Sequence, residues 1–133
     1  MSSPYRDDTH LYTVLQHLFE TLQHQNGNAL DALTRSRLVI RLETTAPQAT
    51  VLIDGRMPPV QVHYGNQKKL RPDLDVRLQA ETLHRILLDE LSLKEALARR
   101  QVHVRGPIWK ATALGDIFTQ GRKLYPEISA KLL

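Results

Sequence analysis

Residues 83–106 read LHRILLDELSLKEALARRQVHVRG, and this stretch decides the fold. Apolar side chains at helical spacing run from Leu83 to Leu91, which predicts one short helix. Ser92 is followed three residues later by Glu95, a capping-box pattern that begins a second helix at once. The stretch therefore predicts two short helices that abut.

A strand and another helix follow directly. Residues 102–105 alternate apolar and polar side chains, and the alternation stops at Gly106. Pro107 suits the first turn of a helix, because the N–H that proline lacks has no partner there. We expect that helix to end near Gly121 and a separate short helix to follow Pro126.

Four further strands are predicted upstream, because the spacing of apolar residues changes to two after Ser36. They cover residues 36–43, 50–54, 60–64 and 73–78. Each strand places aliphatic side chains on one face and mostly charged ones on the other, which is typical of an antiparallel sheet with one covered face. An apolar stripe over residues 11–22 predicts an N-terminal helix, and residues 29–35 can add a helical turn. These helices must cover the apolar face of the sheet.

Length and composition are those of one globular domain over residues 1–133, in which residues 1–8 are expected to fray. No apolar run approaches the roughly 20 residues that span a bilayer, and the first ten residues lack the apolar core of a signal peptide. The chain has no cysteine, which excludes disulfides and thiolate chemistry. We therefore expect a soluble, cytoplasmic protein.

The net charge of +4 is spread along the chain rather than gathered in one block. Aromatic residues are only 5% of the total, so stacking side chains for bases are scarce, and we expect no nucleic-acid partner. The net positive charge is compatible with a transient contact with an anionic membrane surface. A homo-oligomer is equally compatible with this composition.

No group of residues predicts catalysis or a metal site. His10, His17 and His24 recur every seven residues, about 10.5 Å apart along a helix, so they cannot bind one ion together. Asp73 and Asp75 lie on the polar face of a strand, outside any predicted cleft. The glycines are isolated, so no phosphate-binding loop is present. We expect a protein that is not an enzyme and needs no cofactor.

The aliphatic faces of the sheet and helices enclose a volume with no polar chemistry in it. Two interpretations stay open from the residues alone. Leu, Ile and Val side chains could fill this volume as a solid core, or they could line an apolar cavity for a lipid-like ligand. Periodicity does not separate these interpretations, because both need the same inward-facing residues.

Three segments resemble the sterol carrier protein family, the type-two, non-specific lipid-transfer fold. They are VLIDGRMPPVQVHYG, DLDVRLQAETLHRILLDELSLKEAL and QVHVRGPIWKATALGDIF, about 80 residues in all. The resemblance implies an α+β fold: a five-stranded, largely antiparallel sheet with about five helices covering one face and an apolar tunnel between. It also implies binding of sterols, fatty acyl chains or other hydrophobic ligands, without catalysis of a reaction.

The sequence departs from the family pattern at three positions. Asp89 and Arg100 stand where the family commonly has glycine, and Pro107 replaces a polar residue. These differences leave the identity of the ligand open.

The predicted function is therefore binding or carriage of a fatty acyl, sterol-like or quinone-like ligand. The alternative is an accessory or dimerisation scaffold, like factors that aid ubiquinone synthesis, with no transferred ligand. Because the helices after Gln79 are expected to cover the sheet, the candidate ligand-binding residues come mainly from them. The candidates are Val62, Val76, Leu83, Leu87, Leu91, Leu97, Ile108, Trp109, Leu114, Ile117 and Phe118.

Overall fold

The computed structural model describes residues 3–25, 30–65, 69–107 and 110–133. Within them the helices are α1 (Asp8–Gln23), α2 (Leu30–Ser36), α3 (Ala80–Leu87), α4 (Leu93–Ala98) and α5 (Ala111–Leu132). The strands are β1 (Val39–Thr45), β2 (Ala49–Asp54), β3 (Gln61–Tyr64), β4 (Leu74–Gln79) and β5 (Val102–Arg105). The α+β class, the five strands and the two abutting helices are thus confirmed.

The strands form one sheet in the order β3-β2-β1-β4-β5. Three neighbouring pairs are antiparallel and the central pair β1–β4 is parallel, so the sheet is largely antiparallel, as predicted. Leu42 pairs with both Val51 and Val76, which aligns three aliphatic side chains on one face. The preceding residue, Arg41, pairs with Asp75 on the opposite face. This register separates an apolar face from a polar one.

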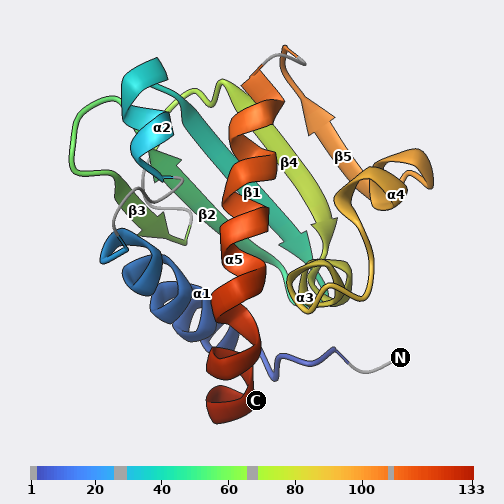
Figure 1. Cartoon of the computed structure of the whole chain (residues 1–133). Helices are drawn as coiled ribbons and strands as arrows, with labels where there is room; N and C mark the ends of the chain where they lie inside the picture. Colours follow the sequence, from blue (N-terminus) through green and yellow to red (C-terminus); the bar gives the residue numbers. More distant parts are fainter. Residues whose placement is uncertain (1–2, 26–29, 66–68, 108–109) are drawn as a thin grey trace.

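Helices α1, α3 and α5 lie over the apolar face (Figure 1), and α5 extends across it with α1 and α3 beside it. Helix α2 lies near one end of the sheet, where Leu33 meets the backbone of Gly55, and α4 lies beside the edge strand β5. No helix in the described part of the chain is long and apolar enough to cross a membrane.

The C-terminal helix differs from the prediction of two short helices. It is continuous from Ala111 to Leu132, with Gly121 and Pro126 inside it. Proline removes one hydrogen bond and disfavours a helix interior. Here the helix continues because residues on both sides of Pro126, namely Tyr125 and Ser129, are buried against the rest of the molecule. Tertiary packing outweighs the local signal.

Gly106 ends β5 for a steric reason. Its φ is +133°, and a Cβ on it would stand 2.4 Å from the Asp73 carbonyl oxygen and 2.8 Å from Leu74 Cδ2. Only glycine fits this close approach of the chain to the start of β4.

From Ser3 onward the described part of the N-terminal segment packs against the rest of the molecule, and the fraying of residues 1–8 stays a prediction. Tyr5 is buried, with 2% of its surface exposed. Asp7 caps α1 by accepting a hydrogen bond from the His10 N–H at 2.8 Å. His10 in turn accepts from the Arg6 N–H at Nδ1 and lies 2.8 Å from the Leu132 carbonyl oxygen at Nε2. These contacts hold the beginning of the chain against the end of α5.

The polar face of the sheet carries ion pairs within and between strands. Arg41 contacts Asp75 at 2.6 Å and Glu43 at 3.1 Å, and Arg77 lies 3.7 Å from Glu43. Leu52, which pairs with Arg41, is nevertheless buried on this face. The long arginine side chains can cover such a residue with their methylene groups while the guanidinium groups stay at the surface.

Candidate functional site

An apolar cavity of about 30 Å³ lies between the helices and the sheet. Side chains from α1, β1, β2, α3 and α5 surround it. All of them are apolar: Leu15, Leu18, Phe19, Ile40, Leu42, Ile53, Leu83, Leu87, Leu114, Ile117 and Phe118.

The spacing of the lining residues explains why each element faces the cavity. On α1 and on α5 the lining residues recur at i, i+3 and i+4, and on α3 they recur at i and i+4. Such positions lie on one side of a helix. Ile40 and Leu42 on β1 are two residues apart and so share the covered face of the sheet.

Five of the predicted ligand-binding residues lie on this cavity: Leu83, Leu87, Leu114, Ile117 and Phe118. The prediction missed the wall that α1 supplies through Leu15, Leu18 and Phe19, and the sheet wall. The apolar stripe of the first helix is evident in the sequence. It does not reveal that this helix faces the same cavity as the last one, because that depends on how the two helices pack.

The remaining predicted residues lie elsewhere. Val76 and Leu91 are buried in the core without lining the cavity, and Val62 is half-buried against the core. Leu97 is 41% exposed, because α4 buries Ala96 and lies at the edge of the sheet. Ile108 and Trp109 fall outside the residues that the structure describes.

A buried polar chain connects α3, α5 and the N-terminal segment. The Tyr125 hydroxyl lies 2.5 Å from the Tyr5 hydroxyl and 2.6 Å from His84 Nδ1. The rings of Tyr5 and His84 also meet edge to face, with centroids 5.9 Å apart. Residues 120 positions apart in the chain are thus hydrogen-bonded, which the sequence patterns do not indicate.

Burial keeps the three hydrogen-bonded side chains uncharged. It raises the pKa of Tyr125 to about 12 and also raises the pKa of Tyr5, so both hydroxyls are neutral at physiological pH. Burial lowers the pKa of His84, which favours the neutral imidazole. A neutral imidazole can accept a hydrogen bond at Nδ1 from the Tyr125 hydroxyl. The three groups therefore satisfy one another without charge.

Gly121 and Leu87 place this polar chain next to the cavity. Leu87 lines the cavity and lies one turn after His84 on α3, and a Cβ on Gly121 would stand 3.2 Å from Leu87 Cδ2. Tyr125 follows Gly121 by one turn on α5. None of the polar side chains reaches the cavity lining. The cavity is apolar but small, and among the residues that the structure describes its lining holds no acid, base or nucleophile.

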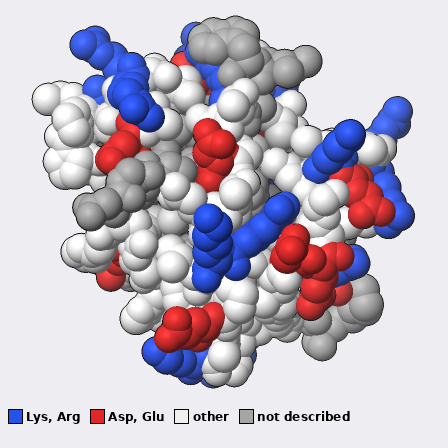
Figure 2. Space-filling view, in the orientation of Figure 1, with Lys and Arg blue, Asp and Glu red and all other residues white. Residues whose placement is uncertain are grey.

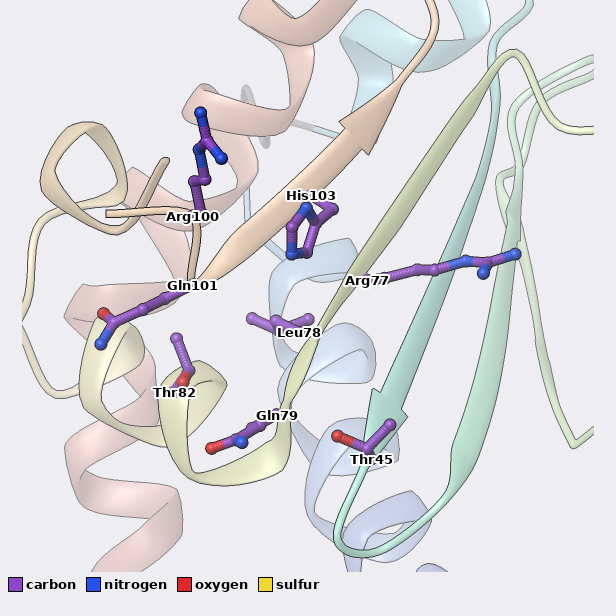
Figure 3. A pocket seen from close by; sticks show the side chains of 8 residues that line it. All are labelled: Thr45, Arg77, Leu78, Gln79, Thr82, Arg100, Gln101 and His103. Carbon is purple, nitrogen blue, oxygen red and sulfur yellow. The ribbon is translucent and has the colours of Figure 1, made fainter. Parts of the chain in front are cut away.

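A second recess, of about 370 Å³, lies where β4 meets α3 and β5. Its lining is largely polar: Thr45, Arg77, Leu78, Gln79, Thr82, Arg100, Gln101 and His103. The side chains of Arg77 and Arg100 extend in different directions from it (Figure 3). Arg77 pairs with Glu43 and Asp75 instead. The cationic groups therefore do not converge on a common point.

Charge is mixed over the helical side of the molecule. On the face drawn, Lys and Arg alternate with Asp and Glu without a large area of one sign (Figure 2). Among the described residues, no group of three His, Cys, Asp or Glu side chains could hold a metal ion.

Comparison with known proteins finds a family model and solved structures that match this chain. The model of the SCP-2 sterol transfer family matches residues 15–119. No curated protein matches the sequence at a significant level.

Solved structures with a similar fold include sterol carrier proteins from insects. The sterol carrier protein domain 2 of Helicoverpa armigera superposes with a TM-score of 0.69 at 17% identity, over 92% of this chain and 96% of that one. Sterol carrier protein 2 like 2 from Aedes aegypti gives 0.58 at 17% identity, over 82% and 96%. The ubiquinone synthesis protein UbiJ-SCP2 gives 0.54 at 19% identity, over 81% and 84%. At identities this low, the superpositions show a shared fold alone.

Proposed function

The chain belongs to the SCP-2 sterol transfer family, a family of lipid-binding and lipid-transfer domains, and we propose that it binds a fatty acyl, sterol-like or quinone-like ligand in the cavity beneath α5. The observation that carries the proposal is the lining of that cavity, which is apolar on every side and built from five different elements. A carrier needs such a site, because a hydrophobic ligand must be shielded from water while it moves between membranes.

The energetics favour a long hydrocarbon chain. Burial of each methylene contributes about 0.8 kcal/mol. A 16-carbon chain then contributes roughly 12 kcal/mol, and micromolar affinity requires about 8 kcal/mol. The difference of about 4 kcal/mol is available to offset the loss of translational and rotational freedom. Apolar contact alone therefore reaches micromolar affinity only where these costs stay near 4 kcal/mol and the cavity widens beyond its volume of about 30 Å³.

The first experiment is mass spectrometry of organic extracts from natively purified protein, combined with displacement of the fluorescent fatty acid cis-parinaric acid. We expect a co-purified lipid, or displacement by at least one fatty acid, sterol or quinone at micromolar concentration. Trp109, the single tryptophan, supplies a second fluorescence signal. If no lipid is extracted and no competitor displaces the probe, the proposal is wrong.

Matched variants locate the binding site. Leu87→Glu places a charge on the cavity wall, whereas Lys94→Glu introduces the same side chain at an exposed position on α4. We expect the first to abolish probe binding and the second to leave it unchanged. Because Leu87→Glu can also unfold the protein, Ile117→Thr serves as a milder change on the same wall, with circular dichroism as the check on folding. Equal binding by all three variants would place the ligand elsewhere.

A second candidate function is an accessory or dimerisation scaffold with no transferred ligand. The observation that favours it is the small volume of the cavity, about 30 Å³, which the surrounding side chains nearly fill. The fold similarity to a ubiquinone synthesis protein is compatible with this alternative. Light scattering on a size-exclusion column distinguishes the two: a stable oligomer without extractable lipid supports the scaffold, and a lipid-loaded monomer supports the carrier.

A cytoplasmic location and a transient contact with anionic membranes complete the proposal. The net charge of +4 favours such a contact through long-range attraction. Co-sedimentation with vesicles of neutral and anionic composition tests it. Binding to anionic vesicles that weakens as salt is added is the expected result, and equal binding to both vesicle types would contradict it.

A further inference from the structure

The polar recess of about 370 Å³ lies at the carboxyl ends of the parallel strands β1 and β4. Thr45 and Gln79 are the last residues of these strands, and they are partners in the register of the sheet. Helix α3 begins at the next residue, Ala80, with no loop between. Because Gln79 and Thr82 both line the recess, the N-terminal end of α3 forms part of its wall (Figure 3).

The start of α3 has hydrogen-bond donors that no side chain caps. The side chains of Asp7 and Ser92 cap α1 and α4, whereas in the described part of the chain Gln79 makes no capping hydrogen bond. The first N–H groups of a helix have no partner within the helix, and they carry the positive end of its dipole. Glu81, the acidic residue of the first turn, lines a different hollow beside Ser3. The uncapped donors are therefore available to the recess.

The buried hydroxyl of Thr82 is an independent sign of a ligand. Thr82 is only 8% exposed and its side chain lines the recess, yet among the described residues its hydroxyl has no hydrogen-bond partner. In other helices, Thr13, Thr21 and Thr119 each donate to the carbonyl oxygen four residues earlier, which Thr82 does not do. Buried hydroxyls are normally hydrogen-bonded. The recess is the side from which a partner can reach this one.

The charges in the lining favour an anion. The lining contains Arg77, Arg100 and His103 and no acidic residue. Arg77 is engaged by Glu43 and Asp75, whereas Arg100 forms no ion pair with any described residue. The Arg100 side chain is exposed and extends out of the recess (Figure 3), and exposed side chains change rotamer within nanoseconds. Its guanidinium group can therefore turn toward an anion that is held at the start of α3.

We propose that this recess binds a phosphate monoester, whose terminal oxygens accept hydrogen bonds from the first N–H groups of α3 and from the Thr82 hydroxyl. Helix N-termini bind phosphate groups in this way. A phosphate has three strong acceptor oxygens, which suit backbone N–H groups, a hydroxyl and a guanidinium together. The side chains of Thr45, Gln79 and Gln101 surround the space that remains for the esterified part.

This site is separate from the apolar cavity, because no residue lines both. The proposal therefore does not rest on the proposed function. Two kinds of molecule carry the required group: a soluble phosphate ester, and a lipid with a terminal phosphate. The chemistry at α3 is the same for both, and the experiment distinguishes them.

The first measurement is a titration of ¹⁵N-labelled protein with glycerol 3-phosphate, followed by NMR. We expect the amide signals of residues 80–83 to shift and to reach saturation. Potassium chloride at equal ionic strength is the control, and we expect it to leave these signals unchanged. Equal shifts with chloride would show general screening of charge and would overturn the site, as would the absence of any shift with glycerol 3-phosphate.

Co-sedimentation with vesicles identifies the source of the phosphate. Vesicles of phosphatidylcholine are mixed either with phosphatidic acid, which has a terminal phosphate, or with phosphatidylglycerol, which is anionic but a phosphodiester. Sedimentation with the first only, reversed by glycerol 3-phosphate, assigns the site to a lipid. Saturable binding of glycerol 3-phosphate without such sedimentation assigns it to a soluble ester.

Two pairs of variants test the residues of the site. Thr82→Val removes the hydroxyl and keeps the shape of the side chain, whereas Thr82→Ser keeps the hydroxyl. We expect valine to weaken binding of glycerol 3-phosphate about tenfold and serine to retain most of the affinity, with circular dichroism as the check on folding. Equal affinities of the valine variant and the wild type would overturn the proposal.

Arg100→Gln and Arg99→Gln remove the same charge from neighbouring positions. Arg99 pairs with Glu95 and does not line the recess, so it is the matched control. We expect Arg100→Gln to weaken binding severalfold and Arg99→Gln to change it less than about twofold. Equal weakening by both would mean that only the overall charge attracts the anion, and the assignment of Arg100 to the site would be wrong.

Discussion

The Arg41 guanidinium lies 2.6 Å from the Asp75 carboxylate, across the parallel pair at the centre of the sheet. The sequence places Arg41 on a polar face, where a change of charge is expected to matter little. In the structure the Asp75 side chain is only 9% exposed and depends on this partner. A residue that pattern analysis treats as surface is thus a structural residue.

We predict that Arg41→Ala lowers the free energy of unfolding by about 1–3 kcal/mol, because it leaves a buried carboxylate without its hydrogen-bonded partner. The control is Arg99→Ala. Arg99 pairs with Glu95 at the same distance of 2.6 Å, but both side chains are exposed, so the expected loss is about 0.3–0.5 kcal/mol. Urea denaturation of both variants measures the difference. Equal losses would show that burial of Asp75 has no influence.

Acid should destabilise the protein through the same carboxylate. The hydrogen bond from Arg41 holds the pKa of Asp75 below its ordinary value of 3.8. The unfolded chain therefore takes up the proton first as pH falls, so this contribution to stability is present above pH 3.8 and is lost below it. Asp75→Asn should flatten the fall in melting temperature below pH 3.8. An unchanged slope in that variant would contradict the assignment.

His84 predicts a second pH effect at higher pH. Burial lowers its pKa below the ordinary value of 6.5. The unfolded chain is protonated first, so stability should decrease as pH falls from 6.5 to the lower pKa of the folded state and then level off. His84→Gln should reduce this decrease, because glutamine carries no titrating group. Thermal unfolding of wild type and variant between pH 7.5 and 5 measures it, and parallel curves would contradict the prediction.

Two glycines should respond in opposite ways to alanine. A Cβ on Gly106 would stand 2.4 Å from a backbone carbonyl oxygen, at a φ of +133°, so Gly106→Ala should cost roughly 2 kcal/mol or more. Nothing lies within 4 Å of a Cβ on Gly115, which is inside α5, so Gly115→Ala should stabilise by about 0.5–1 kcal/mol. Chemical denaturation gives both values. A destabilised Gly115→Ala variant would mean that the helix needs this glycine.

Arg100 provides a test of backbone strain. Its φ of 59° lies in the left-handed region, which is unfavourable by about 1–2 kcal/mol for a residue with a Cβ. Arg100→Gly should therefore stabilise the protein by about 0.5–1 kcal/mol after the extra freedom of glycine in the unfolded chain is subtracted. Arg100→Ala keeps the Cβ and should bring no such gain. A gain of the same size from alanine would assign the effect to charge rather than to the backbone.

Asp89 and Arg100 also show how far the sequence could be interpreted. Both stand where similar sequences commonly have glycine, and both adopt positive φ, of 62° and 59°. The family pattern thus indicated where the backbone turns left-handed at the ends of α3 and α4, where aspartate is tolerated better than most residues and arginine is not. Signals of this kind depend on a few neighbouring residues. Another example is the cap of α4, in which the Ser92 side chain accepts a hydrogen bond from the Glu95 N–H.

The sequence by itself determined most elements and their faces, because hydrophobic periodicity follows from the geometry of each helix and strand alone. The exception is the C-terminal helix α5, which the pattern predicts as two helices and which packing makes continuous. It could not determine which apolar residues line the cavity and which fill the core. Leu18 of α1, Ile53 of β2 and Leu114 of α5 meet only after the elements pack. The same holds for Tyr5 and Tyr125, whose hydrogen bond joins the two ends of the chain. Contacts between distant segments arise from packing, and only the tertiary structure decides them.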